Sequence, residues 1–190
     1  MIKIYITLFY LFFFHLSAEI IQKVEVKGND RISSETVIVY GDIVIGKDYS
    51  RIDINQILKN LYSTDFFEDI NVSLTNGVFQ VTVKEYPVIN SVEIRGENSN
   101  AVKKSIFKRL KLKAKESFIE NKLSQDVNFL KKSYASIGFN FATVEAKIER
   151  FDDNRINLIY FLEKGKKTNI SKINFIGDKK VKEKRLRDII

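Results

Sequence analysis

Few side chains in this sequence could take part in covalent chemistry. Its 190 residues include one histidine, His15, and no cysteine, whereas Ser-His-Asp hydrolysis, Cys-His nucleophilic catalysis and most zinc sites depend on these side chains. Two carboxylate pairs, Glu68-Asp69 and Asp152-Asp153, have the right chemistry for acid–base catalysis, but both fall at predicted turns, where solvated acidic residues are ordinary. A glycine-rich phosphate loop is also missing, because Gly28 and Gly96 each stand alone. We therefore expect a protein that is not an enzyme, with no catalytic residues, no metal and no cofactor.

The net charge of +8 raises the question of an anionic partner. Acidic residues interleave with the lysines, and Lys, Ile and Asn are abundant throughout, as a composition bias would produce. We therefore expect no nucleic-acid binding, and for an exported protein anionic lipid headgroups are the better candidate. The densest group of cations lies near the end of the sequence: Lys179, Lys180, Lys182, Lys184, Arg185 and Arg187.

Residues 1–18 are predicted to be an export signal. Lys3 provides the positive start, Ile4 to Leu16 is an apolar run, and Ser17-Ala18 supplies small residues before Glu19. We predict cleavage between Ala18 and Glu19, which would remove His15 from the mature chain. The alternative is a membrane anchor, but a spanning helix needs about 20 apolar residues and this run is shorter.

One short sequence motif, an alternating apolar strand that ends in glycine, occurs three times. We call it the strand-glycine phrase. It covers Val24 to Asn29, Val92 to Glu97 and Ile173 to Asp178. Recurrence at domain-sized intervals is typical of an array of modules. We therefore predict a first module at residues 19–86, a second at 87–164 and an incomplete third at 165–190, and expect the chain to be the N-terminal fragment of a longer protein.

The first module begins with a strand and two helices. Ile20 to Lys27 alternates apolar and polar residues, as a strand with one buried face does. Ser33 or Ser34 can cap a first helix, predicted over Ser34 to Val44. The second helix begins at a capping box, Ser50 to Asp53, and ends where Asp65 takes the left-handed conformation.

A hairpin completes the module. Ile70 to Leu74 and Phe79 to Val83 alternate on either side of the turn Asn76-Gly77. The two-helix crossover then lets the first strand lie parallel beside the third. The prediction is an α+β fold in which each three-stranded mixed sheet has the order 1-3-2 and is covered on one face by two helices.

The second module repeats this order of elements. Its first helix is marked by Val102, Ile106 and Leu110, and its second is predicted to start at another capping box, Ser117 to Glu120, and to stop at Gly138. Its hairpin turns at Asp152 to Asn154. The joint between the modules is short and contains Pro87, the only proline of the chain.

This arrangement resembles the polypeptide-transport-associated (POTRA) domains of the BamA family of outer-membrane protein assembly factors. Asp65 stands where that family more often has glycine, which affects only the helix end. The resemblance covers essentially all of the chain after the export signal. It depends on Val24 to Asn29 with Arg31-Ile32, on Leu61 to Ile70, on Tyr134 with Gly138-Phe139 and Ala142, and on the recurring strand-glycine phrase.

The resemblance implies a periplasmic arm, exported in a Gram-negative bacterium to the periplasmic face of the outer membrane. The full-length protein would be anchored there by a C-terminal barrel outside this sequence. Its implied partners are unfolded outer-membrane β-barrel precursors and the accessory lipoproteins of the assembly complex, with periplasmic chaperones and the inner leaflet of the outer membrane as further candidates.

The second strand of each sheet is predicted to be an exposed edge to which a client segment can add by β-augmentation. The alternative for either edge is that it binds nothing and is protected by its polar residues. The candidate binding residues are Ile70, Asn71, Val72, Ser73 and Leu74 in module one, and Ala142, Thr143, Val144, Glu145, Ala146, Lys147 and Ile148 in module two.

Two other functions remain open at this point. The same arm occurs in two-partner secretion transporters, where two modules rather than five precede the barrel. A periplasmic interaction protein without a barrel could also use such modules.

Overall fold

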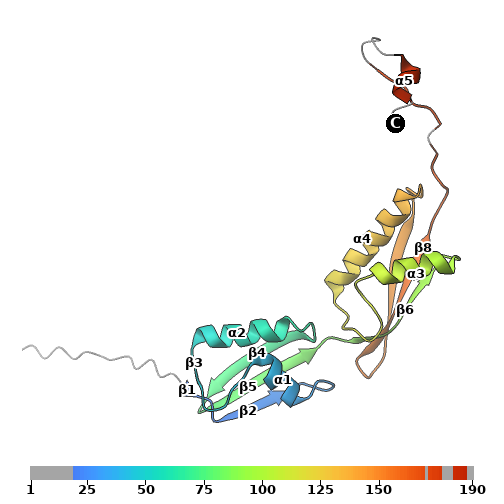
Figure 1. Cartoon of the computed structure of the whole chain (residues 1–190). Coiled ribbons are helices and arrows are strands. Elements are labelled where there is room, and N and C mark those ends of the chain that lie inside the picture. Colours follow the sequence, from blue (N-terminus) through green and yellow to red (C-terminus); the bar gives the residue numbers. More distant parts are fainter. Residues whose placement is uncertain (1–18, 170, 177–181, 188–190) are drawn as a thin grey trace, which may run out of the picture. The chain divides into compact units, whose positions relative to one another are not determined.

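The computed structural model describes residues 19–169, 171–176 and 182–187. The chain divides into two units that meet between Tyr86 and Pro87, both drawn in Figure 1. The predicted export signal with Ala18, the end of the third strand-glycine phrase at Gly177-Asp178, and Lys179 and Lys180 of the basic cluster lie outside the described residues. No helix within the described ranges is long and apolar enough to cross a membrane.

A three-stranded sheet forms the base of the first unit. It contains β2 (Lys23–Lys27), β4 (Phe67–Thr75) and β5 (Val78–Glu85) in the order β2-β5-β4. β2 runs parallel to β5, and β4 runs antiparallel to it. Asn76 and Gly77 both have positive φ values (52° and 74°), as a two-residue hairpin turn of the primed type requires. The predicted 1-3-2 order and the predicted hairpin are therefore confirmed.

Two helices cover one face of this sheet (Figure 1). They are α1 (Ser34–Gly41) and α2 (Arg51–Tyr62). Ser33 caps α1, and the predicted capping box of α2 is present: the Ser50 side chain accepts from the Asp53 amide while the Asp53 carboxylate accepts from the Ser50 amide. The core between the layers consists mainly of Val37, Ile57, Leu61, Phe67, Ile70, Phe79, Val81 and Val83.

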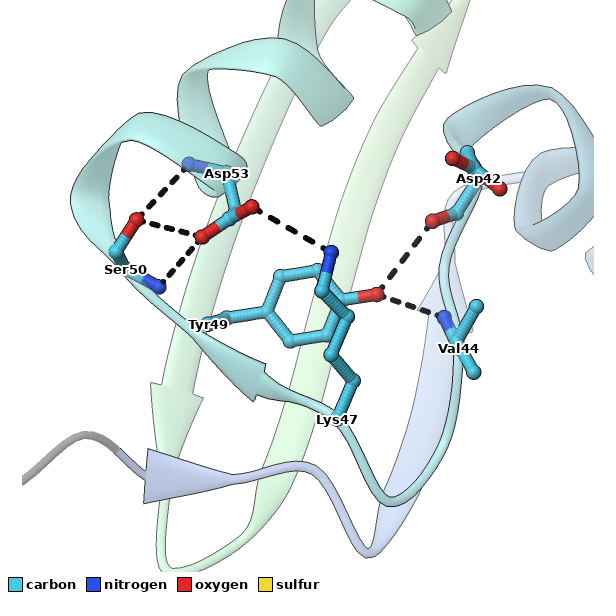
Figure 2. Close-up of polar contacts among 6 residues, drawn as sticks. All are labelled: Asp42, Val44, Lys47, Tyr49, Ser50 and Asp53. Atoms are coloured by element: carbon cyan, nitrogen blue, oxygen red, sulfur yellow. Dashed lines mark hydrogen bonds and ion pairs between the residues drawn. The ribbon is translucent and has the colours of Figure 1, made fainter.

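The first helix is shorter than predicted, because Asp42 takes a left-handed conformation (φ 53°) and ends it at Gly41. Residues 42–49 then fold around the Tyr49 hydroxyl, which accepts from the Val44 amide at 2.7 Å and donates to the Asp42 carbonyl (Figure 2). The strand predicted from Ile20 is also interrupted: β1 (Glu19–Ile20) pairs with β3 (Asp48–Tyr49), and β2 starts only at Lys23.

The second unit repeats the architecture with a longer second helix. Its sheet has the order β6-β8-β7, from β6 (Val88–Arg95), β8 (Arg155–Glu163) and β7 (Thr143–Arg150). Two helices, α3 (Asn100–Arg109) and α4 (Glu120–Ser136), pack on one face. The predicted capping box at Ser117 is wrong: α4 starts at Glu120 without a side-chain cap, because Ser117 lies in a bridge to Val88. A further helix, α5 (Glu183–Arg187), lies in the last described range.

The glycine of the repeated phrase has the same role in both units. Gly28 (φ 77°) lies against the Val83 carbonyl oxygen, and Gly96 (φ 88°) lies against the Leu162 carbonyl oxygen. A Cβ at either position would overlap that oxygen. The phrase therefore ends in glycine because two backbones touch there.

Buried carboxylates accept hydrogen bonds from the backbone of several loops, including those that follow Gly28 and Gly96. Glu85 accepts the amides of Asp30, Arg31 and Ile32 in unit one. Unit two has two buried carboxylates at other places in the fold: Glu97 directly after Gly96 and Asp126 on α4, with exposed fractions of 5% and 1%. Asp126 accepts the amides of Lys111 and Leu112 and the Tyr160 hydroxyl. None of these three carboxylates was predicted, because a sequence pattern does not show which acidic residue turns inward.

Glu97 is held by three groups. It accepts the Ser99 amide at 2.8 Å and the Tyr134 hydroxyl at 2.7 Å, and the Lys164 ammonium lies 2.9 Å away. Burial acts to raise the pKa of Glu97, but these three partners outweigh it and lower the pKa to about 2. The same cluster, through burial and the Glu97 charge, raises the pKa of Tyr134.

Candidate functional site

The structure places both candidate segments at the outer edges of their sheets. Residues 70–74 lie within β4, and residues 143–148 lie within β7; each strand has a neighbour on one side only. Ala142 is a correction to the predicted set, because it precedes β7 and its amide donates to the Phe139 carbonyl in a turn.

The register of the first hairpin decides which backbone groups of β4 point outward. Thr75 and Val78 flank the two-residue turn and form a hydrogen-bonded pair in this geometry. In an antiparallel ladder the bonded residues alternate, so Asn71 and Ser73 bond to β5. The amides and carbonyls of Ile70, Val72 and Leu74 therefore face away from the sheet.

The same argument applies to β7. The Phe151 amide donates to the Arg155 carbonyl at 2.9 Å, which fixes the phase of the ladder. Glu145 and Lys147 consequently bond to β8, and the backbone of Val144, Ala146 and Ile148 faces outward. Within the described part of the chain, no hydrogen bond reaches these outward groups.

One outward group of β4 is already occupied. The Ile70 amide donates to the Tyr62 hydroxyl at 3.1 Å, and that hydroxyl lies 3.5 Å from an Asp69 carboxylate oxygen. Tyr62 is the last residue of α2 and is 43% exposed, so its ring stands over the upstream end of the edge. The site analysis of the sequence missed this residue, although its position one turn after Leu58 was a usable signal.

Module two has no such cap. Asp65 (φ 59°) and Gly138 (φ 96°) are the left-handed residues that end the second helices, so they occupy equivalent positions. Tyr62 lies three residues before Asp65, and Ala135 lies three residues before Gly138, so the two correspond. The methyl group of Ala135 cannot accept a hydrogen bond. As far as residues 19–169, 171–176 and 182–187 show, the β7 edge is therefore open along its length, whereas the β4 edge is open only after Ile70.

Half-buried apolar side chains border both edges. In module one these are Val72 and Leu74 on β4, with Ile54 and Leu58 on α2, which packs against β4. In module two they are Ala146 and Ile148 on β7, with Leu123 and Val127 on α4, which packs against β7. An added strand whose alternate residues are apolar would bury these rows further.

The opposite face of each edge is polar. Asn71 and Ser73 are exposed on β4, and Glu145 and Lys147 are exposed on β7. Lys147 pairs with Glu149 at 3.0 Å, but exposed ion pairs of this kind contribute only about 0–1 kcal/mol. A strand added at either edge would pair through its backbone and one apolar face, without a fixed charge requirement.

The first strands of the sheets are less accessible at their upstream ends. The Ile21 amide donates to the Lys47 carbonyl just before β2. Beside β6, the Ile89 amide donates to the Glu116 carbonyl and the Lys115 amide to the Ile89 carbonyl. Both coverings come from the loop between the two helices, so β4 and β7 are the better edges in each sheet.

Asp152-Asp153 lies in the hairpin turn, as predicted, but the prediction for Glu68-Asp69 is wrong, because both residues lie within β4. Glu68 pairs with Lys84 at 2.8 Å on the surface, and Asp153 pairs with Arg155. Over the ranges that the structure describes, no three His, Asp or Glu side chains are grouped so as to hold a metal ion.

Comparison with known proteins gives a family for the second unit. Residues 87–165 match the POTRA family model, described as "Surface antigen variable number repeat". The chain is also 30% identical over 169 residues to the outer membrane protein assembly factor BamA of Neisseria meningitidis, which covers 87% of this chain and 21% of that protein. BamA of Neorickettsia risticii is 24% identical over 173 residues, 91% of this chain and 23% of that protein.

The chain thus spans about a fifth of the length of these relatives. Among solved structures, the N-terminal domain of Omp85 from Thermosynechococcus elongatus superposes with a TM-score of 0.48 at 18% identity, covering 74% of this chain and 61% of that one.

Proposed function

We propose that the two modules of this chain hold unfolded outer-membrane protein precursors by β-augmentation. The premise is that the chain is a tandem of POTRA domains of the kind found in the outer-membrane assembly factor BamA. The holding sites are the outward backbone of β7 and, after Ile70, that of β4. In this role the chain is a binding arm without enzymatic activity. It works on the periplasmic side of the outer membrane and docks the accessory subunits of barrel assembly.

The observation that carries the proposal is the uncapped β7 edge. Val144, Ala146 and Ile148 each present an amide and a carbonyl that meet no hydrogen-bonding partner within the described residues. An edge of this length next to a half-buried apolar row is a template for another strand. The charged residues Glu145 and Lys147 stand on the opposite face of β7 and leave this outward backbone uncovered.

Backbone pairing alone predicts weak holding. Each added hydrogen bond contributes about 0.5–1.5 kcal/mol net, whereas association costs about 4–15 kcal/mol in lost freedom. Burial of the client's apolar residues against Ala146 and Ile148 must supply the difference. The arrangement favours clients with alternating apolar and polar residues, which is the pattern of strands in outer-membrane barrels.

Amide chemical shifts of the whole chain, followed during titration with a barrel-strand peptide, test the proposal. We expect the largest shifts at Val144, Ala146 and Ile148, smaller ones at Val72 and Leu74, and little change at Ile70 because Tyr62 occupies its amide. The control is the same peptide methylated at alternate backbone nitrogens, which removes donors without changing the side chains. Equal binding of the methylated peptide, or shifts confined to the helices, would contradict the proposal.

A further inference from the structure

A second surface of module two lies on the other side of α4 from the β7 edge. Six residues of α4 recur with helical spacing and line one hollow together with Arg109 of α3: Gln125, Asn128, Phe129, Lys132, Ser133 and Ser136. A second hollow, of about 230 Å³, shares part of this lining and is bordered by residues of both helices. We call this surface the α3–α4 groove.

The floor of the α3–α4 groove is apolar. Ile106, Phe129 and Tyr134 line it, and Val102 and Ile137 stand at its mouth, where Ile137 is 53% exposed. The Arg109 guanidinium lies over the Phe129 ring, with its carbon 4.6 Å from the ring centroid. This stacking holds the arginine in place while leaving its N–H groups available for a carboxylate.

Two cations, Arg109 and Lys132, line the groove, and no acidic residue is among its lining residues. α3 carries Lys103, Lys104, Lys108 and Arg109 and no acidic residue. On α4, Lys131 and Lys132 follow Asp126, which is turned into the core and bonded there. The helices of module one show no such excess, because Arg51 and Lys59 are matched by Glu35 and Asp53. The excess of positive charge therefore belongs to the helices of module two and is not shared by those of module one.

We infer that the α3–α4 groove docks an acidic amphipathic helix of a partner protein, with one bulky apolar side chain in the hollow and carboxylates on Arg109 and Lys132. A cleft between two helices is the shape that accepts a third helix by its apolar face. A concave apolar floor favours such a partner over a flat lipid surface. The inference deepens the docking part of the proposed function, since it names a surface and a chemistry for an accessory subunit.

The test is a fluorescence-anisotropy titration of the whole chain with a labelled synthetic helix. The probe has leucine and phenylalanine on one face and glutamates on the other, and a matched peptide has lysine in place of glutamate. We expect the acidic peptide to bind and the lysine peptide to bind at least about tenfold more weakly, because opposite charges steer and hold the complex.

Neighbouring lysines supply a matched pair of variants. Lys132 lines the groove, whereas its neighbour Lys131 is turned about 100° around the axis of α4 and is not among the lining residues. Lys132→Glu should weaken binding about tenfold and Lys131→Glu about twofold or less. Ile137→Asp should also weaken it, whereas Ile52→Asp, at an exposed position of module one, should not.

Equal losses from the two lysine variants would show diffuse charge attraction and overturn the inference. Loss from Lys131→Glu alone would place the peptide at the β7 edge and overturn it as well. Failure of the peptide to bind, together with Lys132-dependent binding to phosphatidylglycerol vesicles, would assign the surface to lipid. Barrel-strand peptide binding, measured in parallel, should be unchanged by Lys132→Glu, so failure of the groove and failure of the edge are distinguishable.

Discussion

Replacing Glu97 by glutamine should destabilise the second module by about 2–3 kcal/mol at neutral pH. The pKa of Glu97 is about 2 in the folded protein against 4.5 for an unperturbed glutamate. A difference of that size corresponds to about 3 kcal/mol in favour of folding wherever the carboxyl is ionised in both states. Glutamine keeps the shape but loses the charge that holds Lys164 and Tyr134.

The pH dependence has a definite direction. Because folding lowers this pKa, the stabilisation is fully present above about pH 4.5 and is lost as the pH falls toward 2. Wild type and Glu97→Gln should therefore differ at pH 7 and converge near pH 2.

Amide hydrogen exchange in urea gives the free energy of unfolding for each module within one sample. Module one serves as an internal control, and Glu163→Gln, at an exposed position on β8, should cost less than about 0.5 kcal/mol. The reasoning is refuted if Glu97→Gln leaves the exchange of β8 unchanged at pH 7, or if the difference persists at pH 2.

Three further predictions concern the backbone. Gly96→Ala should destabilise module two by more than about 3 kcal/mol in urea unfolding, because the added Cβ would overlap the Leu162 carbonyl oxygen. Gly46→Ala is the control: Gly46 also has a positive φ (86°), but no atom lies near an added Cβ, so the loss should be only about 1 kcal/mol. Tyr62→Phe should free the Ile70 amide, so that its hydrogen exchange accelerates and barrel-peptide shifts extend to Ile70; no change in either would contradict the cap. Ala146→Pro removes an outward amide and should reduce peptide binding at β7 while the sheet survives, whereas Lys147→Pro should break the ladder itself, as circular dichroism would show.

Local patterns predicted most of the fold. The alternation of Ile70 to Leu74 and the turn at Asn76-Gly77 specify a hairpin that the ladder confirms. The spacing of apolar residues in α2 and the pairing of Ser50 with Asp53 likewise specify a helix and its start. These features depend on residues close together in sequence, so they can be predicted without knowledge of the rest of the chain.

Other features depend on contacts that sequence spacing does not reveal. Helix α1 ends early because Asp42 adopts φ 53° in a loop organised by Tyr49, seven residues away (Figure 2). Ser117 has the sequence of a helix cap but lies in a bridge to Val88. The edges themselves were predicted, whereas the Tyr62 cap was not, because it joins the end of α2 to a strand eight residues later.

Each three-stranded sheet takes all its strands from one continuous stretch of chain, and in the described residues no strand pairs across the boundary at Pro87. A gene segment that encodes one such stretch can be duplicated or deleted without leaving a strand that lacks its neighbour. Evolution can therefore lengthen or shorten an arm of this kind by whole units, and copies such as these two can diverge in surface charge while each keeps its own interior.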